Sequence, residues 1–429
     1  MGTTRILAGS LSRRLLRPTS LVPASGHAQR GVCGCCEASS HRRDKKRARL
    51  VRFPRHQHVR SGRTGANGII QQRRAFSSAS SEHTSRRRAI EDTPLETPEG
   101  SALLEGLDVH TVHSDDGHPL ATYTIEGDEA ELEHRTPVLL LHGRTWSSVP
   151  VYHLVGKTDP AGSNESRSLI EALHDSGKIQ PYAMDFRGFG GTPRDESGYV
   201  RPLQCVSDAL AVINWIDERH GAASGGECKR RPSLLGWSHG ALIAQILAQR
   251  HSESLFKLVM YGSMYSPNVK YAIPPPLNTD VHDANCGHTD HDDFPLAELA
   301  ARNNADGAME DFTMSSGVSS ANEAGSIFPP LSAKMFAQAA LISDPIKVRW
   351  RDLHQLNECH PSLVHVPSMV VAGDSDPYAP IATQSELFTN LARGADRTWC
   401  IVSNSDHAVH LSDERCRFVE KVANFLESN

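Results

Sequence analysis

The feature that most constrains this chain is the pentapeptide Gly236–Gly240, which matches the pattern G-x-S-x-G around Ser238. Residues 232–235 before it are typical of a short buried strand, and residues 241–248 after it have the apolar spacing and residue preferences of a helix. Between a strand and a helix, this pattern forms the strained turn called the nucleophile elbow, which lifts a serine hydroxyl clear of the sheet. Its two glycines avoid the clashes that side chains would make as the turn tightens. Ser238 is therefore a candidate nucleophile.

The charges of the chain are distributed unevenly. Residues 1–90 contain 20 Lys and Arg against only Glu37, Asp44 and Glu82, a net charge of +17. Because the whole chain carries −5, the remaining residues carry −22. A basic leader thus precedes an acidic body, which favours one large α/β domain with an extension over several domains of average size.

We predict that residues 1–90 are a mitochondrial targeting segment that is removed after import, with the matrix as destination. They are rich in Arg and Ser and poor in acids, and residues 4–17 favour a basic amphipathic helix. Residues 73–78 resemble a matrix-peptidase cleavage site, with the cut after Phe76. The alternative is a basic tail that binds nucleic acid or an anionic membrane, since residues 42–49 also resemble a nuclear signal. We favour targeting, and expect no nucleic-acid partner.

The body lacks the signs of a membrane protein and of a disulfide framework. No stretch approaches 18 consecutive apolar residues, so we expect no stable membrane insertion. Its six cysteines form no C-x-x-C pair, which indicates free thiols in a reducing compartment.

Strand and helix patterns alternate along the body. Residues 107–113 and 120–125 alternate apolar and polar residues around the turn Ser114–Gly117, which predicts a hairpin. Apolar runs then alternate with amphipathic segments, and this predicts an α/β fold with a mostly parallel central sheet and helices on both faces. The further strands are expected at 137–141, 182–186, 232–235, 256–261, 367–372 and 398–402, and the helices at 203–219, 241–248, 383–391 and 412–426.

The predicted domain plan has five parts: the leader 1–90, a linker 91–106, the first core part 107–263, an inserted helical and loop lid 264–360, and the second core part 361–429. The lid is predicted because no strand pattern recurs in it, and only short helical signals appear at 332–341 and 348–356. Its stretch 280–293 is rich in Asp and His, which are metal ligands. The spacing matches no metal-site pattern, so we expect a solvated loop and no metal.

Taken in order, the motifs of the body resemble those of the α/β-hydrolase family over roughly residues 107–428. Each motif is weak alone, but each stands at a strand end and the order Ser, Asp, His is that of the family. The motifs are Leu140–Gly143, Asp185–Thr192, Gly236–Gly240, Gly373–Pro377 and Ser405–Leu411.

The resemblance implies a catalytic triad of Ser238, Asp376 and His407. A serine hydroxyl is a poor nucleophile at neutral pH, so it needs a base, and family order gives that role to His407. His410 is its competitor, and it resembles a supporting position. Asp376 follows the strand-ending glycine by three positions, as the orienting acid does in the family. Its rivals are Asp374 and Asp406, for which turn and capping roles are the alternative.

The family also implies an oxyanion hole, formed by the backbone N–H of His239 and of Arg144. The side chain of Arg144 either attracts an anionic substrate or forms a salt bridge with an acidic lid. Asp185 and Arg187 are expected to brace a turn. Further pocket candidates are His142, Gly143, Trp146 and Trp237.

The sequence thus predicts a serine hydrolase that cleaves a carboxylic ester or thioester, with a small acyl compound as substrate and without cofactor. Two alternatives stay open: an acyltransferase on the same fold, and a binding module of this fold without catalysis. The sequence indicates neither the acyl group nor the oligomeric state.

Overall fold

The computed structural model describes residues 94–127, 129–155, 166–225, 230–274 and 330–428. The predicted leader, its cleavage after Phe76 and the Asp- and His-rich stretch 280–293 lie outside these ranges.

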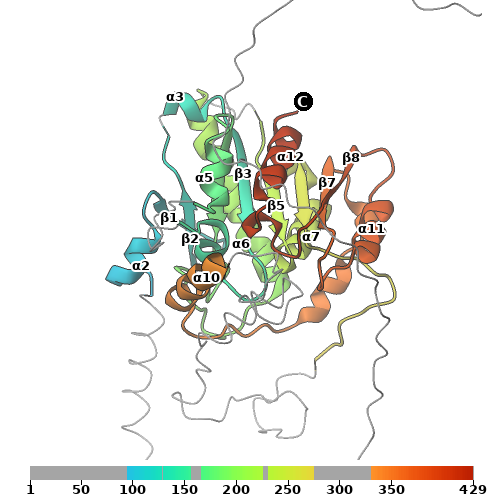
Figure 1. Ribbon diagram of the computed structural model, residues 1–429, viewed down its shortest axis with the longest axis horizontal. Helices are drawn as coiled ribbons and strands as arrows, with labels where there is room; N and C mark the ends of the chain where they lie inside the picture. The colour runs from blue at the N-terminus through green and yellow to red at the C-terminus, as the bar shows by residue number, and fades with distance from the viewer. Residues whose placement is uncertain (1–93, 128, 156–165, 226–229, 275–329, 429) are drawn as a thin grey trace, which may run out of the picture. The chain divides into compact units, whose positions relative to one another are not determined.

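The described residues form an eight-stranded sheet in the order β1-β2-β4-β3-β5-β6-β7-β8 (Figure 1). β1 and β2 form the predicted hairpin, and β2 runs antiparallel to β4. From β4 to β8 all neighbours are parallel, so the predicted sheet type is confirmed. The strands are β1 Asp108–His113, β2 Pro119–Thr124, β3 Thr136–Leu141, β4 Ile179–Met184, β5 Ser233–Trp237, β6 Leu258–Tyr261, β7 Ser368–Gly373 and β8 Arg397–Val402.

Helices cover both faces of this sheet. On one face lie α4 Ser148–Tyr152, α5 Leu169–His174, α10 Pro330–Ser343 and α12 Arg415–Glu427. On the other lie α6 Pro202–Ala223, α7 His239–Arg250 and α11 Ile381–Asn390. The remaining helices are α2 Pro98–Leu103 and α3 Glu129–Leu132, and the 3-10 turns are η1 Ser252–Ser254, η3 Leu353–Glu358, η4 Pro361–Leu363 and η5 Val409–Leu411.

Strand β3 shows why an uninterrupted apolar run forms a central strand. Val138 and Leu140 belong to the core on the α5 and α12 face, whereas Leu139 and Leu141 belong to the core on the α6 and α7 face. All four side chains are fully buried. Successive side chains of a strand point to opposite faces, so a strand covered on both faces is apolar throughout.

Three local expectations differ from the structure. The polar linker 91–106 contains α2, and its Leu95 packs on Tyr123 of β2, so part of it belongs to the folded unit. The short helices α4 and α5 were not expected. The helix expected at 348–356 is wrong: Trp350 lies extended and pairs with Val200, and only η3 is helical there.

The carboxyl ends of the parallel strands lie at the edge of the sheet beside α10. α10 is the described helix of the predicted lid, and it packs against α4 and α2. Of the helices within the described ranges, none has the length and apolar character needed to cross a bilayer.

Candidate active site

Ser238 lies in a strained turn between β5 and α7. Its φ of 55° and ψ of −118° are unfavourable for a residue with a Cβ. The turn is tight because the chain passes very close to its neighbours. A Cβ on Gly236 would lie 2.5 Å from the Cα of Ala241, and one on Gly240 would lie 2.3 Å from the carbonyl oxygen of Leu141. Glycine is therefore required on both sides of the serine.

His407 joins Ser238 to Asp376 in one hydrogen-bond chain. Its Nε2 lies 2.8 Å from the Ser238 Oγ, and its Nδ1 lies 3.0 Å and 3.1 Å from the two carboxylate oxygens of Asp376. Trp237 Nε1 donates to the His407 carbonyl at 2.8 Å and so holds the backbone of the histidine. His407 and Asp376 are buried, whereas Ser238 is half-buried. The structure thus brings together the three residues predicted as a triad.

The Asp376 carboxylate is held by its own loop. Its Oδ1 accepts the N–H groups of Tyr378 at 2.9 Å and Ala379 at 2.8 Å. Gln384 of α11 donates to its Oδ2 at 3.4 Å. These donors fix the carboxylate so that it faces the imidazole.

The rival residues have other partners. Asp374 accepts the N–H groups of Asn404 and Ser405, which is turn chemistry. Asp406 accepts the N–H of Ala408. His410 bonds through Nδ1 to the Tyr261 hydroxyl and donates from Nε2 to the Val151 carbonyl, and burial lowers its pKa to about 3. His410 is thus a neutral structural histidine.

The two predicted oxyanion donors belong to chain segments that lie close to Ser238. His239 opens α7, where first-turn N–H groups have no partner within the helix. Arg144 follows Gly143, and a Cβ on that glycine would lie only 3.5 Å from the Ser238 Cβ. Among the described residues, neither the His239 nor the Arg144 N–H has an acceptor.

The side chain of His239 cannot serve as a base at neutral pH. Burial, with the charge of Arg144 as a second cause, lowers its pKa to about 3. Its ring packs edge-on against Trp350 at 4.3 Å between centroids.

Three of the predicted pocket residues are buried and closely packed. His142 is fully buried: its Nδ1 donates to the Gly143 carbonyl at 2.9 Å, and its Nε2 accepts the Phe186 N–H at 3.1 Å. Burial lowers the His142 pKa to about 3, so the ring is neutral. Trp146 is buried and packs edge-on against Phe336 of α10. Trp237 is buried among Tyr261, His407 and His410.

Asp185 and Arg187 brace the loop after β4. Asp185 accepts the Tyr123 hydroxyl at 2.6 Å and the Ser148 N–H at 2.7 Å. Arg187 forms a bidentate pair with Asp208, with bonds of 2.8 Å and 2.7 Å, and also binds Asp116. These contacts agree with the structural roles expected for both residues.

Sequence reasoning missed Tyr378 and Trp350. The ring of Tyr378 lies 5.1 Å from that of His407 and is 42% exposed, so it stands at the entrance to the site. An aromatic residue two positions after the acid was the available signal. Trp350 had no local signal, because it reaches the site only through the tertiary fold.

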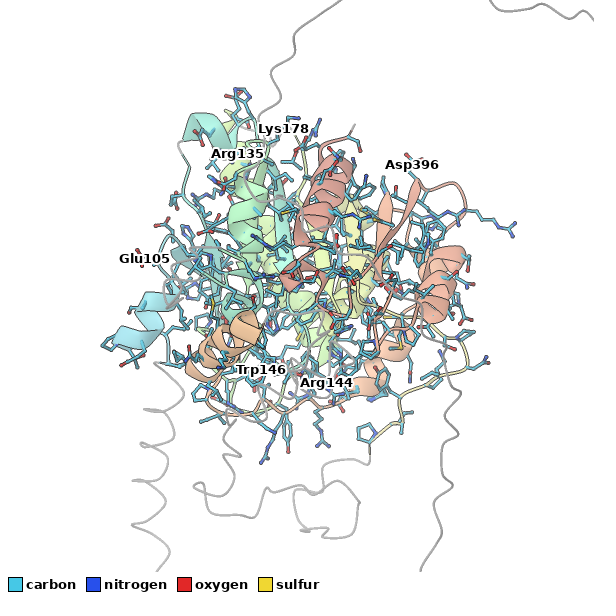
Figure 2. The ribbon with its side chains drawn as sticks, viewed as in Figure 1. Glu105, Arg135, Arg144, Trp146, Lys178 and Asp396 are labelled. Atoms are coloured by element: carbon cyan, nitrogen blue, oxygen red, sulfur yellow. The ribbon has the colours of Figure 1, made fainter. Side chains whose placement is uncertain are left out.

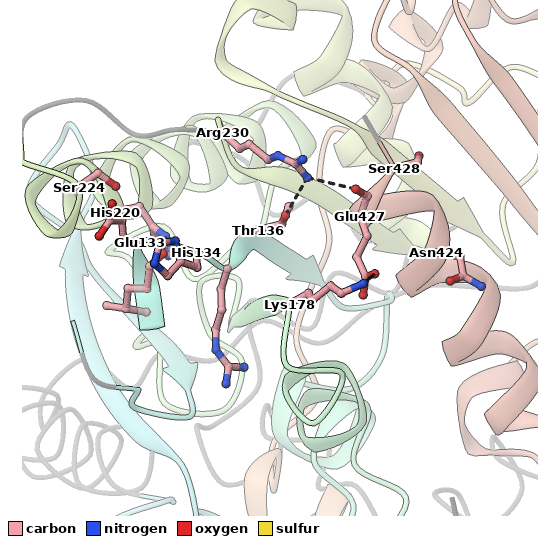
Figure 3. A pocket seen from close by; sticks show the side chains of 12 residues that line it. Glu133, His134, Thr136, Lys178, His220, Ser224, Arg230, Asn424, Glu427 and Ser428 are labelled. Atoms are coloured by element: carbon pink, nitrogen blue, oxygen red, sulfur yellow. Dashed lines mark hydrogen bonds and ion pairs between the residues drawn. The ribbon is translucent and has the colours of Figure 1, made fainter. Parts of the chain in front are cut away.

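A pocket among the described residues lies away from the triad (Figure 3). It measures about 490 Å³ and opens at the amino edge of the sheet, between Thr136 of β3, His220 of α6 and Glu427 of α12. No triad residue lines it. In the described ranges, no three His, Cys, Asp or Glu side chains lie close enough together to hold a metal ion.

A serine elbow after β5, a carboxylate after β7 and a histidine after β8 on this sheet define the α/β-hydrolase class. The sequence matches the model of the Alpha/beta hydrolase family over residues 138–421, and the chain belongs to this family. No curated protein matches it.

Among solved structures, the chain is similar to an esterase from Rhodococcus sp. ECU1013, with 19% identity and a TM-score of 0.44 over 75% of this chain and 98% of that one. It is also similar to a serine hydrolase involved in carbazole degradation, with 15% identity and a TM-score of 0.47 over 75% and 98%. A third similarity is to a thioesterase domain from the curacin biosynthetic pathway, with 13% identity and a TM-score of 0.47 over 75% and 99%.

Proposed function

We propose that the protein is a serine hydrolase that cleaves a carboxylic ester or thioester through an acyl-enzyme. The observation that carries this proposal is the unbroken chain from Ser238 Oγ through His407 to the Asp376 carboxylate, with contacts of 2.8 Å and 3.0 Å. A nucleophile, a base within hydrogen-bond reach and an acid that orients the base are the parts that acyl transfer requires.

In the first half-reaction, Ser238 Oγ attacks the carbonyl carbon of the substrate while His407 Nε2 takes its proton. The carbonyl oxygen becomes an oxyanion, and the N–H groups of His239 and Arg144 bind it. His407 then returns the proton to the leaving alcohol or thiol as the bond to the carbonyl carbon breaks. Asp376 stabilises the imidazolium that exists between these two proton transfers.

In the second half-reaction, water takes the place of the leaving group. His407 accepts a proton from water as its oxygen attacks the acyl carbon, and then gives that proton back to Ser238 Oγ when the acid leaves. The reaction consumes one water and needs no cofactor.

Covalent labelling tests this proposal. The full chain should react with a fluorophosphonate probe, because such probes phosphonylate activated serines, and Ser238→Ala should abolish the label. Ser254→Ala, which changes a serine in η1 at the far end of α7, should leave labelling intact. A folded wild-type chain that stays unlabelled would refute the hydrolase and favour a binding module.

Product analysis separates hydrolysis from acyl transfer. Esters and acyl thioesters of increasing chain length should yield free acid in water alone. If acid forms only slowly and an added alcohol or amine acceptor becomes acylated instead, the transferase alternative holds.

We also propose that residues 1–90 direct the protein to the mitochondrial matrix. Their net charge of +17 and their low content of acidic residues support this. Deleting residues 1–76 should abolish mitochondrial location and leave esterase activity intact. Import of the truncated chain would contradict the proposal.

A further inference from the structure

The chain returns from α10 across the carboxyl edge of the sheet in the segment 344–350. This segment touches the loop that follows β3, which holds Arg144, at two points. Figure 2 shows Arg144 and Trp146 of that loop at the edge where α10 lies. The two points are Asp344 at the start of the segment and Trp350 at its end.

Asp344 connects the loop that follows β3, at Ser147, to the loop that follows β4, at Gly190. Its Oδ2 accepts both the N–H and the hydroxyl of Ser147, each at 2.8 Å. Its Oδ1 accepts the N–H of Gly190 at 2.9 Å. Asp344 is buried, so water competes little for these bonds.

Trp350 contacts the residues of both oxyanion donors. Its indole Nε1 donates to the Arg144 carbonyl at 2.9 Å, and its ring lies edge-on against His239. The backbone around it is anchored, because Val200 donates to the Arg349 carbonyl and accepts the Arg351 N–H, each at 2.9 Å. These backbone hydrogen bonds restrain the position of Trp350 independently of its contacts with Arg144 and His239.

We propose that Trp350 is a positioning residue that preorganises the oxyanion hole, with Asp344 holding the same loop from its other end. The inference rests on the proposed function. A hydrogen bond to the Arg144 carbonyl restrains the backbone rotation of Arg144 and thus the direction of its N–H. Oxyanion donors lower the barrier only when they point at the developing charge before the reaction begins. Trp350 therefore acts on the transition state and little on substrate binding.

Trp350→Phe tests this role, because it keeps an aromatic ring and removes the indole N–H together with part of the fused ring. Loss of a whole oxyanion donor costs about 10²–10³-fold in kcat. Loss of its restraint should cost about tenfold, with KM for a p-nitrophenyl ester nearly unchanged. Trp399→Phe is the matched control: Trp399 packs on Phe388 at the edge strand β8 and should leave kcat unchanged.

A transition-state analogue separates positioning from mere structural damage. A trifluoromethyl ketone forms a tetrahedral adduct with the serine, so its oxyanion needs the same two donors. In Trp350→Phe its inhibition constant should rise by the factor by which kcat/KM falls. An unchanged inhibition constant, or an unchanged kcat, would overturn the inference. If the wild type is not labelled by fluorophosphonate, the proposed function fails first, and the two failures are thus distinguishable.

Discussion

The amino ends and the carboxyl ends of the parallel strands form two edges of the central sheet. Cationic side chains lie at the amino edge, and buried carboxylic acids lie at the carboxyl edge. At the amino edge, cations face the carbonyl oxygens that end the helices. Arg135 donates to the His174 carbonyl at the end of α5 at 2.8 Å, and Lys257 donates to the Phe425 carbonyl near the end of α12 at 2.7 Å. Figure 2 shows Arg135 and Lys178 at the end of the molecule opposite to Arg144 and Trp146.

At the carboxyl edge, buried carboxylates bind backbone N–H groups. Asp185, Asp344 and Asp406 are buried and accept one or more main-chain donors. Burial raises their pKa values to about 6, 7 and 8 in that order.

The difference follows from the direction of the chain. In parallel β-α units the helices start at the carboxyl edge and end at the amino edge, so one edge collects positive helix termini and the other negative ones. At the amino edge, cationic side chains interact favourably with the negative helix ends and so stabilise the fold. At the carboxyl edge, where the positive helix ends lie, the backbone at Ser238 is strained and the buried Asp side chains are unfavourable to ionise. These features favour reactivity over stability.

The largest expected effect is a loss of activity without a loss of stability. Asp376→Asn should lower kcat by about 10⁴-fold, because an amide stabilises the wrong tautomer of His407. The free energy of unfolding should change by less than about 1 kcal/mol, since an amide oxygen still accepts the loop donors. Steady-state ester hydrolysis and urea unfolding measure the two quantities.

Asp374→Asn is the control for this variant, since its exposed carboxylate serves only the turn before Asn404. It should retain activity. If Asp374→Asn loses as much as Asp376→Asn, the orienting acid has been assigned wrongly.

Short sequence motifs were enough to predict the triad, whereas contacts between residues far apart in the sequence could not be predicted. Ser238, Asp376 and His407 stand at strand ends inside short patterns, so family order places them. Asp344 and Trp350 contact residues 197 and 206 positions away, and nothing near them in sequence marks those contacts. The helix expected at 348–356 failed for the same reason, since Trp350 is drawn into an extended bridge with Val200. The sheet was predictable because central strands are buried on both faces and form apolar runs.

The next prediction concerns the way in which Asp406, at the carboxyl edge, makes the free energy of unfolding depend on pH. Folded Asp406 keeps its proton up to about pH 8, whereas an unfolded Asp loses it near pH 4. The native state then binds more protons, so the free energy of unfolding of the wild type falls as the pH rises between about 4 and 8. Asp406→Asn removes this loss, and should gain about 4 kcal/mol relative to wild type between pH 5 and pH 9. Urea unfolding at several pH values measures it.

The free energy of unfolding of Asp406→Asn, relative to wild type, should rise with pH. A difference that stays flat between pH 5 and pH 9 would mean that Asp406 ionises without cost and that the carboxyl edge carries no such penalty.

The smallest expected effect lies at the amino edge. It is a loss of stability without a loss of activity, the reverse of what we expect for Asp376→Asn. Lys257 is buried, and besides Phe425 it binds the carbonyl and the hydroxyl of Ser428 just after α12. Lys257→Met fills similar volume but leaves these carbonyls without their cation, and should lower the free energy of unfolding by about 2 kcal/mol. The value of kcat/KM should not change, because the triad lies at the other edge.

Lys178→Met shows whether burial is what makes the cation matter. Its ammonium group pairs with Glu427 at 2.8 Å, yet its side chain is 70% exposed. Exposed ion pairs contribute only about 0–1 kcal/mol, so this variant should unfold almost as the wild type does. Equal losses in the two lysine variants would mean that net charge at this edge, and not the direct bonds to the end of α12, provides the stability. A loss of activity in Lys257→Met at unchanged stability would instead show that the two edges are coupled through the sheet.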